Sequence, residues 1–566
     1  MKLFDPIKVG GITLKNRTYM LSMGSPGQLG QRAVDYYVAR AKGGTAALVT
    51  GIVASYDLLV KRIEEMRPLV DQVHEAAPDC KIAIQPAICG KDPAPVSPSG
   101  KYWDATSKAL GMGRGDAPGP VALTKDGIKE AIEIQAESAY LQKKIGFDFL
   151  EFHGTHAYVL RQFFSPQDNK RDDEYGGSLE NRMRFPLEVV RAARQAVGND
   201  FAITYKMPAL EEDPNGITLA DSARFAMELE KAGVDALVVS QGLNMHPKGY
   251  IATVVPLYAS YGLGSFVDYA EFIRKWVSIP VVAVGRIVRP DQAEAILEEG
   301  KADIVGLGRQ LIADPDWANK AQRGAWGNIA PCQSCNSCLD RGRYDHMTCA
   351  VNARAVQERE TEYGPAQTRK RVMVVGSGPG GMETARIAAE RGHDVTIYEK
   401  GDQLGGLLRA AAQPVHKEQV ERLRQYLVME LGRTGVKVKL NTPVDAALVK
   451  KEKPDAIVVA TGSRPRTLNI PGVDRENVIF AEDALLNQSK VGKRVLVVGG
   501  GMVGLELAET FAKQGKAVYL VEILEELGRD LALYNKPPVV QNTKEAGVVS
   551  YVRAHPEEIT AEGVKV

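Results

Sequence analysis

Four of the six cysteines lie within 18 residues and could hold a metal. They follow the spacing C-x2-C-x2-C-x10-C, at Cys332, Cys335, Cys338 and Cys349. Structural zinc usually draws on two separated pairs of cysteines, whereas three thiolates two residues apart with a distant fourth suit a [4Fe-4S] cluster. The spacing therefore favours the cluster, with zinc or unliganded thiols as alternatives.

Two glycine-rich loops in the last third of the chain have the spacing of dinucleotide-binding sites. The first is G-x-G-x-x-G at Gly376, Gly378 and Gly381, directly after a short apolar run. Such glycines allow a tight turn and the close approach of a pyrophosphate to a helix amino terminus. An acid after the next strand, here Glu399, accepts hydrogen bonds from a ribose. This context indicates a dinucleotide rather than a tight β-α turn without a ligand.

The second loop repeats that arrangement. Gly499, Gly501 and Gly504 follow another apolar run, and Glu522 ends the next one. Because a carboxylate there suits the free hydroxyls of NAD and would repel the 2′-phosphate of NADP, we expect NADH. Two such units in series resemble the FAD/NAD(P)-binding domains of the flavoprotein disulfide reductases, and Gly405 and Gly406 match the segment that approaches the flavin in that family.

The amino-terminal half carries two histidines and a tyrosine close together, at His153, His156 and Tyr158. They follow the fourth of eight predicted strands, and barrels place their catalytic groups at the carboxyl ends of strands. A single histidine is more often structural, but three such side chains favour a catalytic role facing a cofactor. Glycine–arginine pairs after the seventh and eighth strands indicate a mononucleotide phosphate site, at Gly285, Arg286, Gly308 and Arg309.

These side chains need a scaffold, and β-rich runs alternate with amphipathic segments between residues 16 and 325. The expected strands cover residues 18–23, 46–51, 81–85, 147–152, 201–206, 236–240, 281–284 and 303–307. The expected helices include residues 31–42, 124–144, 179–197, 219–232 and 290–298. Eight β-α units of this kind predict an α/β fold, a (β/α)8 TIM barrel. A doubly wound open sheet is the alternative.

At 566 residues the chain is too long for a single hydrophobic core. We expect a TIM barrel over residues 1–325, a cluster segment and linker over 326–369, an FAD-binding Rossmann-like domain over 370–490 and an NAD(H)-binding one over 491–566. The net charge of +1 argues against a nucleic-acid partner. Without an apolar run of about 18 residues we expect no membrane span and a cytoplasmic location. The sequence leaves a homo-oligomer open.

The barrel resembles the Old Yellow Enzyme family. The segment HGTHAYVLRQFFSPQDNKRDDEYGGSLENRMRF, from His153 to Phe185, is the most diagnostic; NRTYMLSM resembles the first flavin strand, and VGRI and GLGRQLIADPDW resemble the FMN phosphate loops. With the cysteines and the dinucleotide loops, the whole chain is similar to the long branch of that family. This branch includes 2,4-dienoyl-CoA reductases, 2-enoate reductases, bile-acid oxidoreductases and trimethylamine dehydrogenase.

The resemblance implies roles for individual residues. His153 and His156 match the pair that binds the substrate carbonyl or carboxylate oxygen, Tyr158 matches the proton donor, and His246 lies near an active-site histidine of the dienoyl-CoA reductases. Gln85 matches the residue that hydrogen-bonds the flavin pyrimidine, and Lys206 stands where arginine is common near flavin N1 and O2. The remaining FMN contacts implied are Met23, Gly24, Gly285, Arg286, Gly308 and Arg309.

The resemblance also implies the reaction. We expect an NADH-dependent oxidoreductase with FMN, FAD and a [4Fe-4S] cluster that reduces, or reversibly desaturates, a C=C bond conjugated to a carbonyl, in a small substrate that includes CoA thioesters. Electrons would pass from NADH through FAD and the cluster to FMN. The alternatives are an amine dehydrogenase and an electron-transfer flavoprotein. The amine branch has a flavin-linking cysteine where this chain has Gly24, and a tyrosine where it has His153.

Two departures from the family pattern stand out. QPAICGK, residues 85–91, replaces the usual Q-L-x-H-x-G-R, with Ile88 for histidine and Lys91 for arginine, so we expect an atypical wall on the substrate side. The sequence also ends at Val566, before the strand that would return to the FAD domain, so we expect either that the chain is a fragment or that its second flavin site is incomplete.

Overall fold

The computed structural model describes residues 1–23, 29–53, 55–90, 96–99, 121–156, 158–241, 262–339, 347–532 and 534–566. The chain divides into two compact units. The first contains Met1–Trp326 and Asn336–Glu360, and the second contains Gly327–Cys335 and Thr361–Val566.

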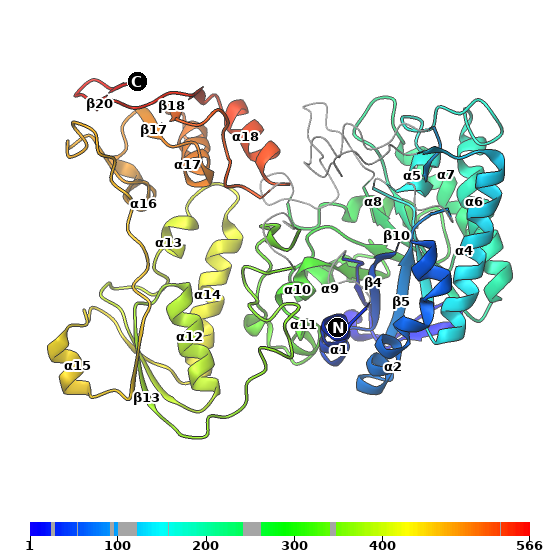
Figure 1. The fold of residues 1–566 in the computed structure, drawn as a ribbon, viewed down its shortest axis with the longest axis horizontal. Helices are drawn as coiled ribbons and strands as arrows, with labels where there is room; N and C mark the ends of the chain where they lie inside the picture. Colours follow the sequence, from blue (N-terminus) through cyan, green and yellow to red (C-terminus); the bar gives the residue numbers. More distant parts are fainter. Residues whose placement is uncertain are drawn as a thin grey trace. The chain divides into compact units, whose positions relative to one another are not determined.

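The first unit is built on a closed barrel of eight parallel strands (Figure 1). The strands follow one another around the ring in chain order, and helices lie between consecutive strands in the sequence, as the crossovers between parallel strands require. This confirms the predicted TIM barrel and excludes the open sheet. The strands are β3 (Thr18–Met20), β4 (Ala47–Val53), β5 (Lys81–Pro86), β8 (Phe149–His153), β9 (Ala202–Pro208), β10 (Ala236–Ser240), β11 (Val281–Ala283) and β12 (Ile304–Leu307).

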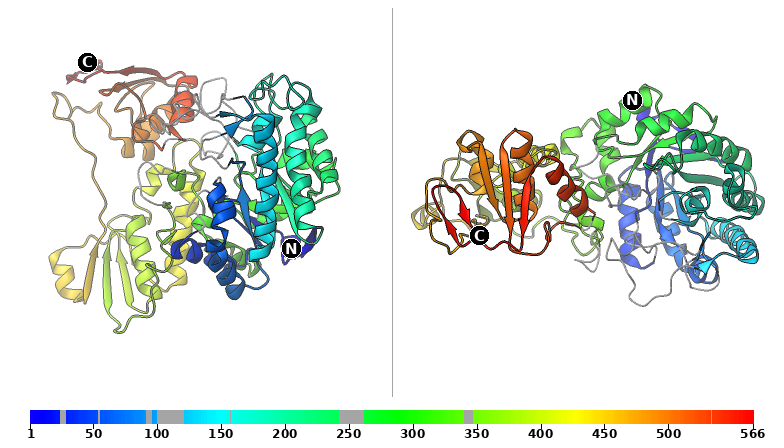
Figure 2. Two further views of the ribbon diagram at one scale, coloured as in Figure 1. Left: turned by 45° about the vertical axis from the view of Figure 1, so that its right-hand side comes forward. Right: turned by 90° about the horizontal axis from the view of Figure 1, so that it is seen from above.

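The helices of this unit lie outside the strands (Figures 1 and 2). Four of the five expected helices have the predicted bounds, and the fifth is displaced by one residue. Helix α7 shows why the helix bounds could be predicted from the sequence. Thr218 and Asp221 form a reciprocal capping box at its start. The helices are α1 (Gln31–Lys42), α2 (Arg67–Ala76), α4 (Lys125–Ile145), α5 (Val159–Phe164), α6 (Leu179–Val197), α7 (Leu219–Ala232), α8 (Val267–Arg274), α9 (Pro290–Glu298), α10 (Arg309–Ala313) and α11 (Trp317–Gln322).

The barrel interior changes character along its axis. Its amino-terminal end is apolar and packs side chains such as Val49, Phe149 and Val282 beneath the hairpin of β1 (Ile7–Val9) and β2 (Ile12–Leu14). Towards the carboxyl ends of β5, β8 and β9 the buried side chains become polar. Catalytic side chains of barrels come from this end. The short strands β6 (Val96–Ser97) and β7 (Val121–Ala122) form a separate pair.

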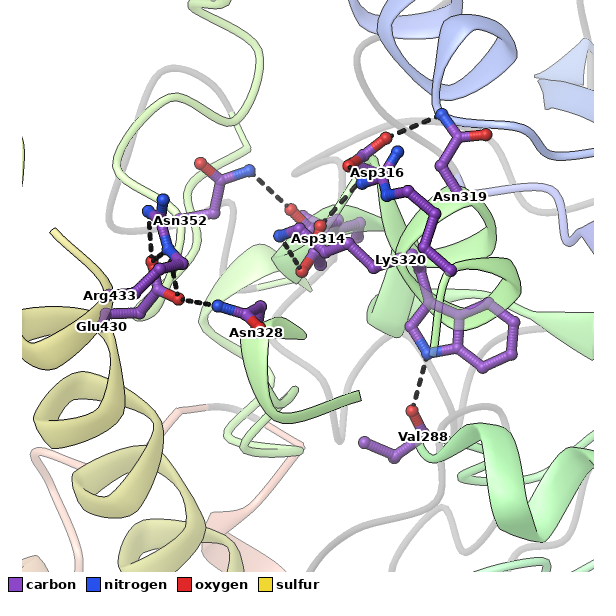
Figure 3. A network of polar contacts seen from close by, with 12 residues as sticks. Val288, Asp314, Asp316, Asn319, Lys320, Asn328, Asn352, Glu430 and Arg433 are labelled. Carbon is purple, nitrogen blue, oxygen red and sulfur yellow. Dashed lines mark hydrogen bonds and ion pairs between the residues drawn. The ribbon is translucent and has the colours of Figure 1, made fainter. Parts of the chain in front are cut away.

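A polar network fixes the short helices that follow β12 (Figure 3). Lys320 Nζ donates to Asp314 Oδ2 at 2.8 Å, and the Asp316 amide donates to Asp314 Oδ1 at 3.1 Å. Asn352, in the segment after the cysteines, donates to the Ile312 carbonyl of α10 at 2.8 Å. These contacts tie that segment to the barrel's last β-α connection.

The second unit contains two parallel sheets with different partners. The first has the strand order β15-β14-β13-β16 and is covered on one face by α12 (Pro379–Glu390) and α14 (Glu418–Arg433) (Figure 1). Asn328 Nδ2 donates to Glu430 on α14 at 2.6 Å, which attaches residues 327–335 to this sheet (Figure 3). The strands are β13 (Arg371–Val375), β14 (Asp394–Tyr398), β15 (Lys437–Lys439) and β16 (Ala456–Val459), and the remaining helices are α13 (Leu408–Ala411), α15 (Ala446–Glu452) and α16 (Ala481–Leu486).

The second sheet has the order β17-β18-β19, and α17 (Met502–Lys513) and α18 (Lys536–Glu545) accompany it. One face of this sheet is exposed and apolar, with Val549 and Tyr551 about half accessible. Its strands are β17 (Arg494–Val498), β18 (Ala517–Glu522) and β19 (Val549–Val552), and a hairpin of β20 (Glu558–Ile559) and β21 (Val564–Lys565) ends the chain. Among the described residues, no helix is both long and apolar enough to cross a membrane.

Candidate active site

The structure brings His153, His156 and Tyr158 together at the carboxyl end of β8. The His153 and Tyr158 rings lie 4.0 Å apart between centroids, and the two histidine rings lie 5.1 Å apart at an interplanar angle of 70°, edge to face. Tyr158 directly precedes α5. The three side chains that the sequence singled out therefore form one cluster at the end of the barrel where catalytic groups lie.

The backbone of this turn is unusual. His156 has a φ of +54°, in the left-handed region that residues other than Gly adopt uncommonly. Gly154 packs against the Tyr205 ring so closely that a β-carbon would lie 2.1 Å from it. A turn with these two constraints holds the histidines in fixed positions, as a preorganised site requires.

Both histidines are neutral because of their surroundings. Burial lowers the pKa of His153 and of His156 well below the usual value, and the nearby Lys206 ammonium lowers both further. The Thr155 amide donates to His153 Nδ1 at 3.4 Å, which favours the tautomer with the ring proton on Nε2. His156 Nε2 lies 3.3 Å from Ser240 Oγ. Neutral imidazoles of this kind can donate a hydrogen bond to a substrate oxygen.

Gln85 and Lys206 lie among buried polar groups that the sequence analysis had not grouped. Gln85 Nε2 donates to Glu151 Oε1 at 2.5 Å, and Tyr19 Oη donates to Glu151 Oε2 at 2.7 Å. Lys206 pairs in register with His153 on the neighbouring strand and is nearly buried. Burial lowers the Lys206 pKa, while Glu151 opposes that shift.

Sequence reasoning missed Glu151, Tyr19, Ser240 and Gln241 as members of this cluster. A signal existed for Glu151, because a charged residue stands in the middle of the otherwise apolar strand β8. Ser240 and Gln241 end β10, and Thr155 Oγ1 donates to the Gln241 carbonyl at 2.8 Å. The position at a strand end was a signal there as well.

The loops after β11 and β12 have the tight geometry of a phosphate-binding cradle. Gly285 has a φ of +110°, and a β-carbon on it would lie 2.8 Å from the Phe266 amide nitrogen. Arg286 is also left-handed, with a φ of +52°. Gly308 precedes α10 and lies against Met23, whose sulfur would be 3.4 Å from an added β-carbon. Met23 and the two glycine–arginine pairs thus come from three neighbouring strands.

Two predicted site residues lie outside the described residues, namely Gly24 and His246. Lys91 of the atypical QPAICGK segment is also outside them, whereas Ile88 is buried. Their predicted roles therefore stay predictions.

The four clustered cysteines form no disulfide within the described part of the chain. Cys338 and Cys349 belong to the first unit, and Cys332 and Cys335 to the second. Arg309 reaches the cysteine segment, because its guanidinium donates to Asn336 Oδ1 at 2.5 Å. Within the part of the chain that the structure describes, no three His, Cys, Asp or Glu side chains are gathered as a metal site. Four thiols remain a donor set that fits an iron–sulfur cluster.

In the second unit, the first glycine loop has the geometry that the sequence predicted. Gly376 is left-handed, with a φ of +100°, and a β-carbon on Gly381 would lie 2.0 Å from the Gly376 oxygen. A β-carbon on Gly378, at the start of α12, would meet nothing within 4 Å. Glu399 accepts from the Ser377 hydroxyl at 2.6 Å and the Gly401 amide at 2.8 Å, and such bonds hold its pKa low despite burial.

The Q-L-G-G segment folds back onto this loop. The Gly405 amide donates to the Ser377 carbonyl at 3.0 Å, and a β-carbon on Gly406 would lie 2.9 Å from the Gly378 Cα. The structure therefore places Gly405 and Gly406 beside the first dinucleotide loop, and their approach to a flavin stays a prediction.

The second glycine loop is closely similar. Gly499 has a φ of +104°, Gly501 caps α17, and a β-carbon on Gly504 would lie 1.8 Å from the Gly499 oxygen. Glu522 accepts from the amides of Gly500, at 2.6 Å, and Leu524, at 2.8 Å. The carboxylate is thus fixed beside the turn, where an acid that contacts a ribose belongs.

Comparison with known proteins agrees with this geometry. The chain is 36% identical to an NADH oxidase of Thermoanaerobacter brockii, over 99% of this chain and 89% of that protein. It is 34% identical to a cinnamate reductase of Clostridium sporogenes, over 93% of this chain and 83% of the relative. A solved structure of 2-naphthoyl-CoA reductase with 2-naphthoyl-CoA superimposes with a TM-score of 0.91 at 28% identity, covering 100% of this chain and 89% of that one.

Family models cover both units. Residues 370–566 match the pyridine nucleotide-disulphide oxidoreductase family, which binds FAD and NAD(P). Residues 2–328 match the NADH:flavin oxidoreductase / NADH oxidase family, more than half of the chain. The expected resemblance is confirmed: this chain is an oxidoreductase that belongs to the NADH:flavin oxidoreductase / NADH oxidase family.

Proposed function

We propose that this enzyme uses NADH to reduce a carbon–carbon double bond conjugated to a carbonyl group. The observation that carries the proposal is the cluster of two neutral histidines and a tyrosine at the carboxyl end of β8. The cinnamate reductase and 2-naphthoyl-CoA reductase relatives act on conjugated carbonyl compounds, which supports this substrate class.

The two histidines would polarise the substrate carbonyl. With its proton on Nε2, His153 can donate a hydrogen bond to the oxygen, and His156 is close enough to share that oxygen. Fixed donors aimed at developing negative charge are an effective form of electrostatic catalysis. Because both rings are neutral, they stabilise the charge without giving up a proton to it.

Tyr158 would then supply the proton at the α-carbon. Its phenol lies against the His153 ring, so it is close to any carbonyl compound that the histidines hold. FMN, when bound, supplies the hydride for the β-carbon. Gln85 and Lys206 would contact its ring, and Met23 would be a further flavin contact. Its phosphate would be held by Gly285, Arg286, Gly308 and Arg309. The orphaned Gln85 oxygen and the glycine turns fit such a group.

The other cofactors follow from the remaining motifs. We assign FAD to the loop at Gly376–Gly381 with Glu399, Gly405 and Gly406, and NADH to the loop at Gly499–Gly504 with Glu522. Cys332, Cys335, Cys338 and Cys349 would hold a [4Fe-4S] cluster, for which the thiol spacing is the support. Anaerobically purified protein should contain about four iron and four sulfide per chain. Stoichiometric zinc without sulfide would contradict this assignment.

The reaction is tested by anaerobic NADH oxidation against a panel of acceptors. The panel contains a free enoate such as cinnamate, an aromatic CoA thioester, an enone steroid and a flavonoid, with a methylated amine tested as a reductant in the opposite direction. We expect NADH consumption that depends on one of the unsaturated carbonyl compounds, with the saturated product formed in equal amount. Flavin reduction by the amine, with no enone product, would favour the amine dehydrogenase instead.

A further inference from the structure

Glu151 is a carboxylate buried completely inside the barrel. It stands at the centre of β8 with no accessible surface, between the apolar end of the barrel and the histidine cluster. Burying a carboxylate costs much free energy unless hydrogen bonds compensate for the lost water. Two donors do so here, because Gln85 Nε2 bonds one oxygen at 2.5 Å and Tyr19 Oη bonds the other at 2.7 Å.

The contact with Glu151 fixes which way the Gln85 amide faces. Burial raises the Glu151 pKa, while the Lys206 charge and the hydrogen bonds from Tyr19 and Gln85 lower it and favour the ionised form. An ionised carboxylate only accepts hydrogen bonds, so the nitrogen of the Gln85 amide is the atom that faces Glu151. Gln85 Oε1 therefore points the other way. This oxygen is buried and has no hydrogen-bond partner among the residues that the structure describes, although the Gln85 side chain has no accessible surface.

An unpaired buried acceptor calls for a donor on the ligand. The pyrimidine edge of a flavin presents the sequence acceptor, donor, acceptor, as O2, N3–H and O4, so an amide oxygen can pair there only with N3–H. We propose that Glu151 is a positioning residue that holds the Gln85 amide with its oxygen towards N3–H of FMN. The inference rests on the proposed function only in requiring FMN in the barrel.

The neighbouring charge fits this arrangement. Lys206 is on β9, the strand next to β8, two positions beyond Thr204, which pairs in register with Glu151. Glu151 and Lys206 interact electrostatically, and this interaction raises the Lys206 pKa against the effect of burial. The anion that orients Gln85 thus also helps to keep a positive charge beside it, where the flavin ring would lie.

The test compares binding of FMN with binding of 3-methyl-FMN, which has no N3–H. The full chain is first stripped of FMN, and quenching of flavin fluorescence on rebinding gives each Kd. An unpaired buried polar group typically lowers affinity by about 5- to 100-fold, so we expect wild type to prefer FMN by a factor in this range. Steric cost of the methyl group is common to all variants and cancels when their preferences are compared.

Glu151→Leu should reduce that preference by at least about fivefold, because nothing then prevents the amide from turning over. Gln85→Leu should reduce the preference for FMN by the same factor. Adding Glu151→Leu to Gln85→Leu should not reduce the preference further. Tyr19→Phe, which removes the other partner of Glu151, should leave it unchanged. The reciprocal double variant Glu151→Gln, Gln85→Glu keeps an acceptor towards N3–H and should restore the preference for FMN. This variant also provides the test if Glu151→Leu does not fold.

Equal preferences in wild type and Glu151→Leu, or equal effects of Glu151→Leu with and without the Gln85 amide, would overturn the positioning role. That outcome differs from failure of the proposed function, in which wild type would bind neither flavin in the barrel.

Discussion

The barrel site and the two dinucleotide loops are preorganised by different parts of the chain. In the barrel, buried side chains form the site, and His153, Glu151 and Lys206 are each almost fully removed from water. In the second unit, the backbone forms the site: Gly376, Gly381 and Gly504 are where an added β-carbon would strike a carbonyl oxygen.

The difference follows from what each ligand part presents. A pyrophosphate is recognised by backbone N–H groups at a helix amino terminus, which any sequence supplies if glycine allows the approach. A reacting carbonyl needs donors and a proton source of defined chemistry, which only particular side chains supply. Substitutions in the loops should therefore act by blocking the backbone geometry, and substitutions in the barrel site by removing a reacting or hydrogen-bonding group.

The largest expected effect concerns shape. Gly381→Ala would place a β-carbon 2.0 Å from the Gly376 oxygen, so the turn cannot close as it is. We expect loss of FAD and a fall in stability of roughly 3 kcal/mol or more, as for a severely overpacked site. Flavin content after gel filtration and thermal unfolding measure the two effects.

Two neighbouring glycines provide matched controls. Gly378 and Gly380 have space for a β-carbon in the protein itself. Gly380→Ala should retain both FAD and stability. Gly378→Ala should remain folded but bind FAD weakly, because only the pyrophosphate would meet the methyl group. Equal behaviour of Gly381→Ala and Gly380→Ala would show that shape does not control this loop.

A chemical change in the barrel should affect only one of the two half-reactions, which are reduction of the enzyme by NADH and its reoxidation by an enone. Tyr158→Phe keeps the ring beside His153 and removes the hydroxyl. Since general acids typically contribute about 10²–10⁴-fold, reoxidation of the reduced enzyme by an enone should slow by that factor. Reduction by NADH, which depends on the second unit, should be unchanged.

Stopped-flow absorbance follows both half-reactions in the same protein. A normal reoxidation rate would remove Tyr158 from the mechanism and leave solvent or His246 as the proton source. Loss of FMN from the variant would indicate that the tyrosine only packs in the barrel mouth.

The same contrast explains what the sequence could predict. The eight strands were evident because parallel strands buried on both sides form apolar runs, as in Val281–Ala283. The glycine loops were evident because their function requires glycine at fixed spacing. The grouping of Gln85, Glu151 and Tyr19 was not, because these residues are up to 132 positions apart and meet only when the barrel closes. No local pattern encodes such a meeting.

One side chain in the second unit should act through chemistry rather than shape. Glu522 is nearly buried and held by two backbone amides beside the second loop. Glu522→Gln removes the charge that would repel the 2′-phosphate of NADP. A hydrogen bond to a charged group is worth about 1.5–3 kcal/mol, so we expect the ratio of kcat/KM for NADH to that for NADPH to fall roughly tenfold.

Reduction of FAD, followed at limiting nucleotide, gives both constants. Ser377, in the first loop, bonds the corresponding Glu399 through its hydroxyl. Ser377→Ala is a control, since it changes the first loop and should leave the nucleotide preference unaltered. An unchanged ratio in Glu522→Gln would place the selectivity elsewhere.

The smallest effect concerns the two histidines and pH. Their folded-state pKa values lie well below about 6.5, the value expected in an unfolded chain, through burial and the Lys206 charge. Below pH 6.5 the unfolded chain therefore binds protons that the folded barrel does not, and the free energy of unfolding should fall by up to about 1.4 kcal/mol per pH unit for each histidine. Above pH 6.5 they should contribute no pH dependence to the free energy of unfolding.

All four tryptophans lie at or before Trp326, in the first unit, so tryptophan fluorescence during urea unfolding reports on the barrel alone. The double variant His153→Gln, His156→Gln should lose the acid slope, and an identical slope in that variant would show that the pair is not held neutral.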